Sequence, residues 1–137
     1  MNLKKIILTS ALIGTSCAPI KQRNNLQMQS NYDQLVLGLI EQNFEQEVLH
    51  SNVPVIIDFY TTWCIPCRYA NRGFEELARE HTEVRFASYD CDNGEVCDNY
   101  NIRTLPTFLI FKNGEEIAGQ KGFIDKAGLE YFLEDNL

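Results

Sequence analysis

The chain has 137 residues, of which 45% are hydrophobic and 23% are charged, and its formal net charge is −7. This length and composition are typical of one globular domain and exclude a disordered or fibrous chain. The acidic balance, without a run of lysine or arginine, argues against a nucleic-acid partner.

The first 17 residues have the pattern of a secretory signal. Lys4 and Lys5 give a basic start, residues 6–14 (IILTSALIG) are mostly apolar, and small residues follow. The apolar run is too short for a transmembrane helix, which needs about 20 residues. We therefore expect residues 1–17 to be a signal peptide. The protein would be exported to a bacterial periplasm or to a membrane surface facing it, with a cytoplasmic location as the lesser alternative.

Cys17 leaves two cleavage patterns open. Small residues before a cysteine are typical of a bacterial lipoprotein signal, in which the cysteine is lipidated and becomes the mature N-terminus. Gly14 stands where that signal usually has leucine. Cleavage after Ala18 is the alternative, although signal peptidases disfavour Pro19 as a first residue. Membrane anchoring through Cys17 is thus one of two predictions, and polar residues 18–32 are predicted to be a flexible tether.

Two segments with regular patterns follow the tether. Residues 34–40 (QLVLGLI) form a short apolar run that predicts a strand, and Phe44, Val48 and Leu49 then recur at helical spacing. Residues 53–61 (VPVIIDFYT) are β-branched and aromatic, which is typical of a buried strand.

Cys64 and Cys67 form a CxxC pair at the end of this second strand. A bare CxxC fits a metal site, a structural disulfide or a reversible redox couple. A helix is predicted to begin near Ile65, which places Cys64 beside unpaired N–H groups and the positive end of the helix dipole. Both favour a thiolate, so Cys64 is the candidate nucleophile. Cys67, one turn later, could resolve a mixed disulfide.

The other two readings of the pair are weaker. Zinc needs four ligands, and the CxxxxxC spacing of Cys91 and Cys97 is unlike a zinc knuckle. A permanent 64–67 ring would stabilise little compared with a crosslink around a long loop, because it is so small. We therefore expect no metal and no cofactor. In an exported protein Cys91 and Cys97 are predicted to form a structural disulfide, with free thiols and a second redox site as alternatives.

The rest of the chain completes an alternating pattern. Predicted in turn are a strand in residues 83–92, a turn with a short helix in 93–102, a hairpin in 103–123 and an amphipathic helix in 125–137. Asn113-Gly114 is a strong hairpin-turn signal, and Asp125 is a plausible N-cap. This order predicts an α/β fold with a mixed central β-sheet flanked by helices on both faces. His50 and His81 stand alone, and we predict surface positions and no role for them.

From about residue 34 to its end the chain resembles a thioredoxin. The resemblance rests on VIIDFY before the cysteines, WCIPC itself, LPT about forty residues later, FKNGE at the hairpin, Gly122 and the final helix. It implies a thioredoxin fold over residues 33–137 and a protein-disulfide oxidoreductase. Its partners would be protein disulfides and a membrane or soluble electron donor, and we expect a monomer.

The resemblance also implies roles for single residues. Asp58 is a carboxylate in an apolar strand, which should raise its pKa, and a buried structural aspartate is the alternative. The family aspartate at its position assists proton transfer at the resolving cysteine. Pro106 matches a cis proline that packs against the disulfide, and Leu105 would pair its backbone with substrate. The other predicted substrate-docking positions are Trp63, Ile65, Pro66 and Gly122.

The chain departs from the family pattern at several positions. Ile65 replaces a glycine between the cysteines, and Arg72 replaces a helix-kinking proline. Ser88 replaces a lysine beside the buried aspartate, and this loss should leave Asp58 more protonated. In an oxidising compartment we expect a reductant, with an oxidase or isomerase as alternatives. A thioredoxin-fold binding module, such as a chaperone or metallochaperone, is the rival function.

Overall fold

The computed structural model describes residues 35–137. The predicted signal peptide, tether and Cys17 lie outside this part. Its elements are β1 (Val36–Leu39), α2 (Glu41–Phe44), the π-helical η1 (Glu45–Leu49), β2 (Val55–Tyr60), α3 (Ile65–Glu80), β3 (Arg85–Asp90), α4 (Val96–Asn99), β4 (Thr107–Lys112), β5 (Glu115–Lys121) and α5 (Lys126–Asn136). None of these helices is long and apolar enough to cross a bilayer.

The five strands form one mixed sheet in the order β1-β3-β2-β4-β5. The pairs of β3 with β1 and with β2 are parallel, whereas β4 runs antiparallel to both β2 and β5. β2 therefore lies at the centre of the sheet, and the cysteine pair follows its C-terminal end. This arrangement confirms the predicted α/β fold with a mixed sheet.

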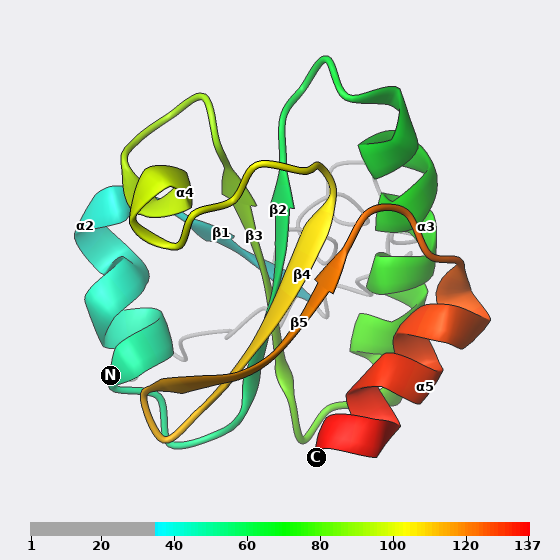
Figure 1. Cartoon of the computed structure of the whole chain (residues 1–137). Coiled ribbons are helices and arrows are strands. Elements are labelled where there is room, and N and C mark those ends of the chain that lie inside the picture. Colours follow the sequence, from blue (N-terminus) through cyan, green and yellow to red (C-terminus); the bar gives the residue numbers. More distant parts are fainter. Residues whose placement is uncertain (1–34) are drawn as a thin grey trace, which may run out of the picture.

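Helices cover both faces of the sheet (Figure 1). α3 and α5 pack on one face, against a core that includes Ile56, Phe86 and Phe108. α2, η1 and α4 lie on the other face, where Ile57 and Phe59 belong to a second core. Alternate residues of β2 thus enter opposite cores, which explains why its sequence is almost continuously apolar.

The hairpin and the last helix follow their local sequence signals. Asn113 and Gly114 connect β4 to β5 with φ values of 54° and 81°, a left-handed conformation that glycine adopts at little cost. α5 begins at a true N-cap, because the Asp125 carboxylate accepts a hydrogen bond from the Gly128 N–H at 2.9 Å. Both predictions are confirmed.

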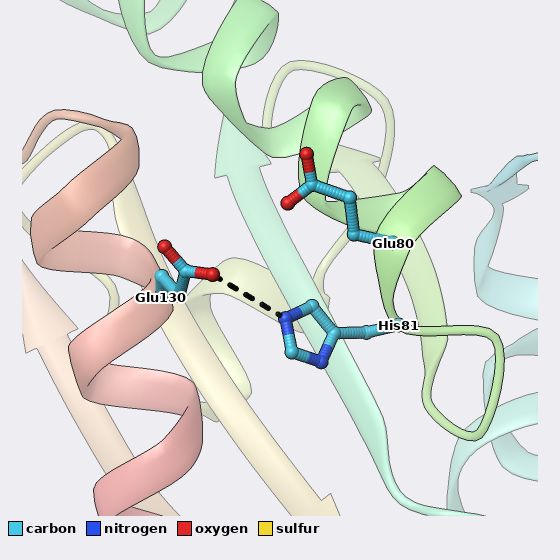
Figure 2. Close-up of side chains that lie close together, drawn as sticks. All are labelled: Glu80, His81 and Glu130. Carbon is cyan, nitrogen blue, oxygen red and sulfur yellow. Dashed lines mark ion pairs between the residues drawn. The ribbon is translucent and has the colours of Figure 1, made fainter.

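A group of ionisable side chains ties the C-terminal end of α3 to α5 (Figure 2). His81 was predicted at the surface, but its side chain is only 18% exposed. Its Nδ1 lies 3.1 Å from Glu83 Oε1, and its Nε2 lies 4.0 Å from Glu130 Oε1. Glu80 could complete a set of metal ligands with His81 and Glu130. However, Lys126 Nζ lies 2.6 Å from Glu80 Oε1, so we interpret the group as an ion-pair network between the helices.

Candidate active site

The cysteine pair lies between the end of β2 and the first turn of α3. Cys64 is the N-cap residue of α3, and its Sγ accepts a hydrogen bond from the Cys67 N–H at 3.3 Å. The two sulfurs are joined in a disulfide, with 5.3 Å between the Cα atoms. Ile65 and Pro66 open the first turn, where the missing N–H of proline costs nothing. The structure therefore brings the two cysteines together in their oxidised state.

The position of Cys64 makes the pair chemically asymmetric. When the disulfide opens, a Cys64 thiolate meets the Cys67 N–H and the positive end of a 16-residue helix. Both interactions favour the ionised sulfur. Both cysteines are buried, at 6% exposure for Cys64 and 2% for Cys67, but only Cys64 occupies the N-cap, whereas Cys67 lies inside the first turn. Cys64 therefore suits the role of attacking group and Cys67 the role of resolving group.

Asp58 lies in the centre of β2, on the sheet face that α3 covers. Its side chain is 2% exposed, and its Oδ1 has no hydrogen-bond partner. Burial disfavours the charged carboxylate and raises the pKa of Asp58 to about 7. In the register of the sheet, Ser88 on β3 stands opposite Asp58. The position that carries lysine in the family thus offers no cation to this carboxylate.

A cavity of about 320 Å³ joins Asp58 to the disulfide. Both Asp58 and Cys67 line it, and so do Thr61, Asn71 and Glu75. The last three residues did not stand out in the sequence. These residues line one cavity because of the way α3 packs on the sheet, and a local sequence pattern does not predict that packing.

Three of the predicted docking residues, Leu105, Pro106 and Gly122, meet at the loop before β4. The Leu105–Pro106 peptide bond is cis, and the Pro106 carbonyl accepts a hydrogen bond from the Gly122 N–H at 2.8 Å. Gly122 has a φ of 83°, and a Cβ there would meet no atom within 4 Å. Its conformation favours glycine, and the space beside it is open to a ligand.

Exposed apolar side chains flank the nucleophile. Trp63 and Ile65 are 68% and 63% exposed, although both are large and hydrophobic. The Trp63 indole N–H donates to Asp92 Oδ2 at 2.9 Å, which fixes the ring beside Cys64. Asp92 was not recognised from the sequence because 29 residues separate it from Trp63. Exposed aromatic groups that are held in place in this way are typical of a docking surface.

Cys91 and Cys97 form a second disulfide, between the end of β3 and α4. Their Cα atoms are 5.6 Å apart, and Cys97 is buried in the core on the α2 side of the sheet. The backbone N–H of Cys91 donates to the Tyr60 carbonyl at 2.8 Å. This crosslink closes the loop that carries Asp92. The two cysteine pairs are thus joined separately, as two disulfides.

A mixed sheet with a CxxC disulfide at a helix N-terminus defines the class of thiol–disulfide oxidoreductases. Residues 35–135 match the family model described as Thioredoxin. The chain belongs to the thioredoxin family, and its Cys64–Cys67 pair is the redox-active disulfide of that family.

Similar proteins occur in distant organisms. A thioredoxin of Rickettsia bellii is 35% identical over 102 residues, which cover 73% of this chain and 97% of that protein. Thioredoxin C-2 of Corynebacterium nephridii is 34% identical over 106 residues, or 74% and 96% of the two chains. A probable thioredoxin-2 of Caenorhabditis elegans is 39% identical over 98 residues, or 70% and 68%. The matched part is the oxidoreductase domain.

Proposed function

We propose that the chain is an exported protein-disulfide reductase, which takes electrons from a membrane or soluble donor and passes them to protein disulfides. The observation that carries the proposal is Cys64 at the N-cap of α3, hydrogen-bonded to the Cys67 N–H and joined to Cys67. This arrangement supplies an ionised nucleophile and a resolving group one turn away. The chain has no histidine between the cysteines, which favours a reductant over a strong oxidant.

The reaction follows from this asymmetry. The Cys64 thiolate attacks one sulfur of the substrate disulfide, and the other sulfur leaves as a thiolate. Cys67 then gives its proton to Asp58 and attacks Cys64 Sγ in the mixed disulfide. The Cys64–Cys67 bond forms, and the second substrate sulfur leaves with the electron pair of the broken bond. The substrate gains two electrons, and the dithiol loses two.

The proposed compartment rests on the leader. A basic start, a short apolar run and Cys17 support export with lipid anchoring, and residues 18–32 would form a tether between membrane and domain. A disulfide between Cys91 and Cys97 agrees with an oxidising compartment, where such crosslinks persist. Reduction of disulfides there needs a supply of electrons from outside that compartment.

A trapping experiment tests the reaction. The wild type should reduce insulin disulfides repeatedly when dithiothreitol is supplied, because Cys67 releases each mixed disulfide. Cys67→Ser should stop at a covalent complex with insulin, visible by mass spectrometry without reducing agent. Cys64→Ser is the matched control and should form far less complex, because Cys67 lacks the N-cap position that favours a thiolate. A Cys67→Ser variant that turns over like wild type would refute the mechanism.

The compartment has its own test. The full-length chain is expressed in a bacterium that processes lipoproteins, and the mature N-terminus is determined by mass spectrometry. We expect a mature chain that begins at a lipidated Cys17, and Cys17→Ala should abolish the lipid. Retention of Met1 in a protein found only in the cytoplasm would contradict export while leaving the redox chemistry intact.

A further inference from the structure

The cavity behind the disulfide exists because one row of the sheet carries small side chains. Gly38 on β1, Ser88 on β3 and Asp58 on β2 stand opposite one another in the register. Neighbours in such a row project from the same face of a sheet. Glycine and serine therefore leave space between this edge of the sheet and α3, just outside the Asp58 carboxylate.

One stripe of α3 forms the other wall. Cys67, Asn71 and Glu75 follow one another at intervals of four residues, so they lie on one side of the helix and all three line the cavity. Cys67 is buried, Asn71 is exposed and Glu75 is half-buried. The stripe spans about 12 Å, and beyond the buried Cys67 its side chains reach solvent. The Asn71 amide donates to Glu75 Oε1 at 2.8 Å and holds the carboxylate in place.

Two buried oxygens in this cavity lack a partner within the protein. They are Asp58 Oδ1 and Thr61 Oγ1, in side chains that are 2% and 3% exposed. Buried polar groups without a partner are rare, and ordered water commonly satisfies them. A cavity of about 320 Å³ with these polar groups in its wall has room for several water molecules, since each occupies about 30 Å³ in the liquid. The shape and chemistry thus suit a chain of water molecules.

This cavity is separate from the predicted docking side. Its lining contains none of the docking positions Trp63, Ile65, Pro66, Leu105, Pro106 and Gly122. A substrate seated on those residues would exclude water from the front of the disulfide and leave the cavity open behind it. We propose that the cavity is a hydrated proton path that connects Cys67 and Asp58 to solvent while substrate is bound, with Glu75 exchanging the proton at its mouth.

The inference rests on the proposed reaction and adds the fate of its proton. Cys67 transfers a proton to the Asp58 carboxylate before its sulfur attacks the mixed disulfide. Asp58 then passes the proton to water in the cavity, and Glu75 relays it to solvent, so the carboxylate is regenerated for the next cycle. The other titratable groups that line the cavity are Tyr60 on β2 and Arg68 on α3, while β1 and β3 contribute none.

The test follows the two chemical steps separately in the full-length reduced protein. The probe is a cysteine peptide joined to nitrothiobenzoate by a disulfide. Attack by Cys64 releases the coloured nitrothiobenzoate, whose absorbance gives the first rate. Resolution by Cys67 is followed by the fluorescence of Trp63, which is the single tryptophan of the chain. Both rates are measured against pH, in water and in heavy water.

Two variants interrupt the path at different points. Ser88→Leu fills the cavity beside Asp58, and Glu75→Gln removes the relay at its mouth. We expect Ser88→Leu to slow resolution about tenfold, a part of what acid–base transfer contributes, and Glu75→Gln to slow it less. The slowed step should show a larger solvent isotope effect. The first step should be unchanged, since the attack by the Cys64 thiolate needs no proton from Asp58.

Matched variants separate blockage from other effects. Ser88→Ala keeps the cavity open, and Glu76→Gln removes the same charge from the next residue, which pairs with Lys126 at 3.8 Å instead of lining the cavity. Both should resolve at the wild-type rate. If Ser88→Leu does not fold, Asn71→Leu narrows the cavity from an exposed position and should slow resolution in its place. Equal rates in the filled and open variants would overturn the proton path.

A different variant tests the proposed reaction itself, separately from the cavity path. Asp58→Asn should slow resolution by about 10² if Asp58 accepts the proton of Cys67. Unchanged resolution in Asp58→Asn would refute the reaction itself. A slow Asp58→Asn beside unaffected Ser88→Leu and Glu75→Gln variants would refute the cavity path alone.

Discussion

Asp58 combines its proposed part in proton transfer with a cost to folding. The carboxylate is buried in an apolar strand, and the Ser88 hydroxyl cannot replace the charge of a lysine. Burial therefore raises the pKa of Asp58 in the folded chain to about 7, from the ordinary aspartate pKa of 3.8. A group with a pKa near neutrality is suited to accept and release protons at the pH of most cellular compartments.

This shift predicts how stability depends on pH. Between pH 3.8 and about 7 the folded state binds more protons than the unfolded state, so the free energy of unfolding falls as pH rises. Asp58 should thereby remove roughly 4 kcal/mol of stability between pH 4 and pH 8. Asp58→Asn cannot ionise and should lose less stability over this range. Urea unfolding of the oxidised proteins at several pH values measures the difference.

The exposed Glu134→Gln variant serves as the control for a generic charge effect. Its stability should follow the wild-type pH dependence, because an exposed carboxylate keeps its hydration in both states. Parallel curves for wild type and Asp58→Asn would mean that the carboxylate is not buried in the folded protein.

At the scale of elements, the second disulfide predicts a measurable contribution. It closes a loop of residues 91–97 between β3 and α4, and a crosslink around so short a loop stabilises the fold by about 2 kcal/mol. Cys91→Ser with Cys97→Ala should therefore lower the free energy of unfolding by about that amount. Serine suits the half-buried position and alanine the buried one.

Activity in the same double variant tells a structural crosslink from a second redox site. Because the reaction uses Cys64 and Cys67, insulin reduction should continue at close to the wild-type rate. A large loss of turnover in protein that remains folded would assign a redox role to the second pair.

Elements with strong local signals were predictable from the sequence. The β-branched run of β2, the start of α3 after Cys64 and the Asn113-Gly114 turn each follow from neighbouring residues. The resemblance to thioredoxins supplied Asp58 and Pro106, which local patterns alone leave ambiguous. The sequence did not reveal the π-helical η1 or the bulge between Ile110 and Phe111, because both depend on how elements meet in the folded chain.

The site was predictable to the same extent. Cys64 and Cys67 are fixed by their spacing and by the helix that follows them. In contrast, the Trp63–Asp92 hydrogen bond and the wall from Asn71 to Glu75 join separate parts of the molecule. These residues come together only through tertiary packing, so no sequence motif identifies them.

The whole molecule couples its stability to the state of the Cys64–Cys67 pair. The folded chain holds the two Cα atoms 5.3 Å apart in the oxidised state, since α3 and β2 are fixed by the cores on both faces. An unfolded chain must close the same ring from many conformations, which costs about 2 kcal/mol of loop entropy. The disulfide is therefore formed more favourably in the folded protein.

The helix dipole stabilises the reduced folded protein, and this reduces the stability advantage of the oxidised form. A Cys64 thiolate at the N-terminus of α3 gains about 0.3–1 kcal/mol from the helix dipole. Since this is smaller than the entropy of ring closure, the oxidised protein should unfold with about 1 kcal/mol more free energy than the reduced protein. By the thermodynamic cycle, the folded dithiol is then a stronger reductant than the unfolded one by roughly 20 mV.

Urea unfolding of the oxidised and reduced forms measures this coupling. Cys91→Ser with Cys97→Ala is the background, so that dithiothreitol reduces only the active pair. A further Cys64→Ser and Cys67→Ser change gives the control, whose unfolding curve should be the same with and without the reductant. If the reduced form proves the more stable one, stabilisation of the thiolate exceeds the entropy of ring closure. The folded protein would then release electrons less readily than its unfolded chain, which would count against the proposed role as a reductant.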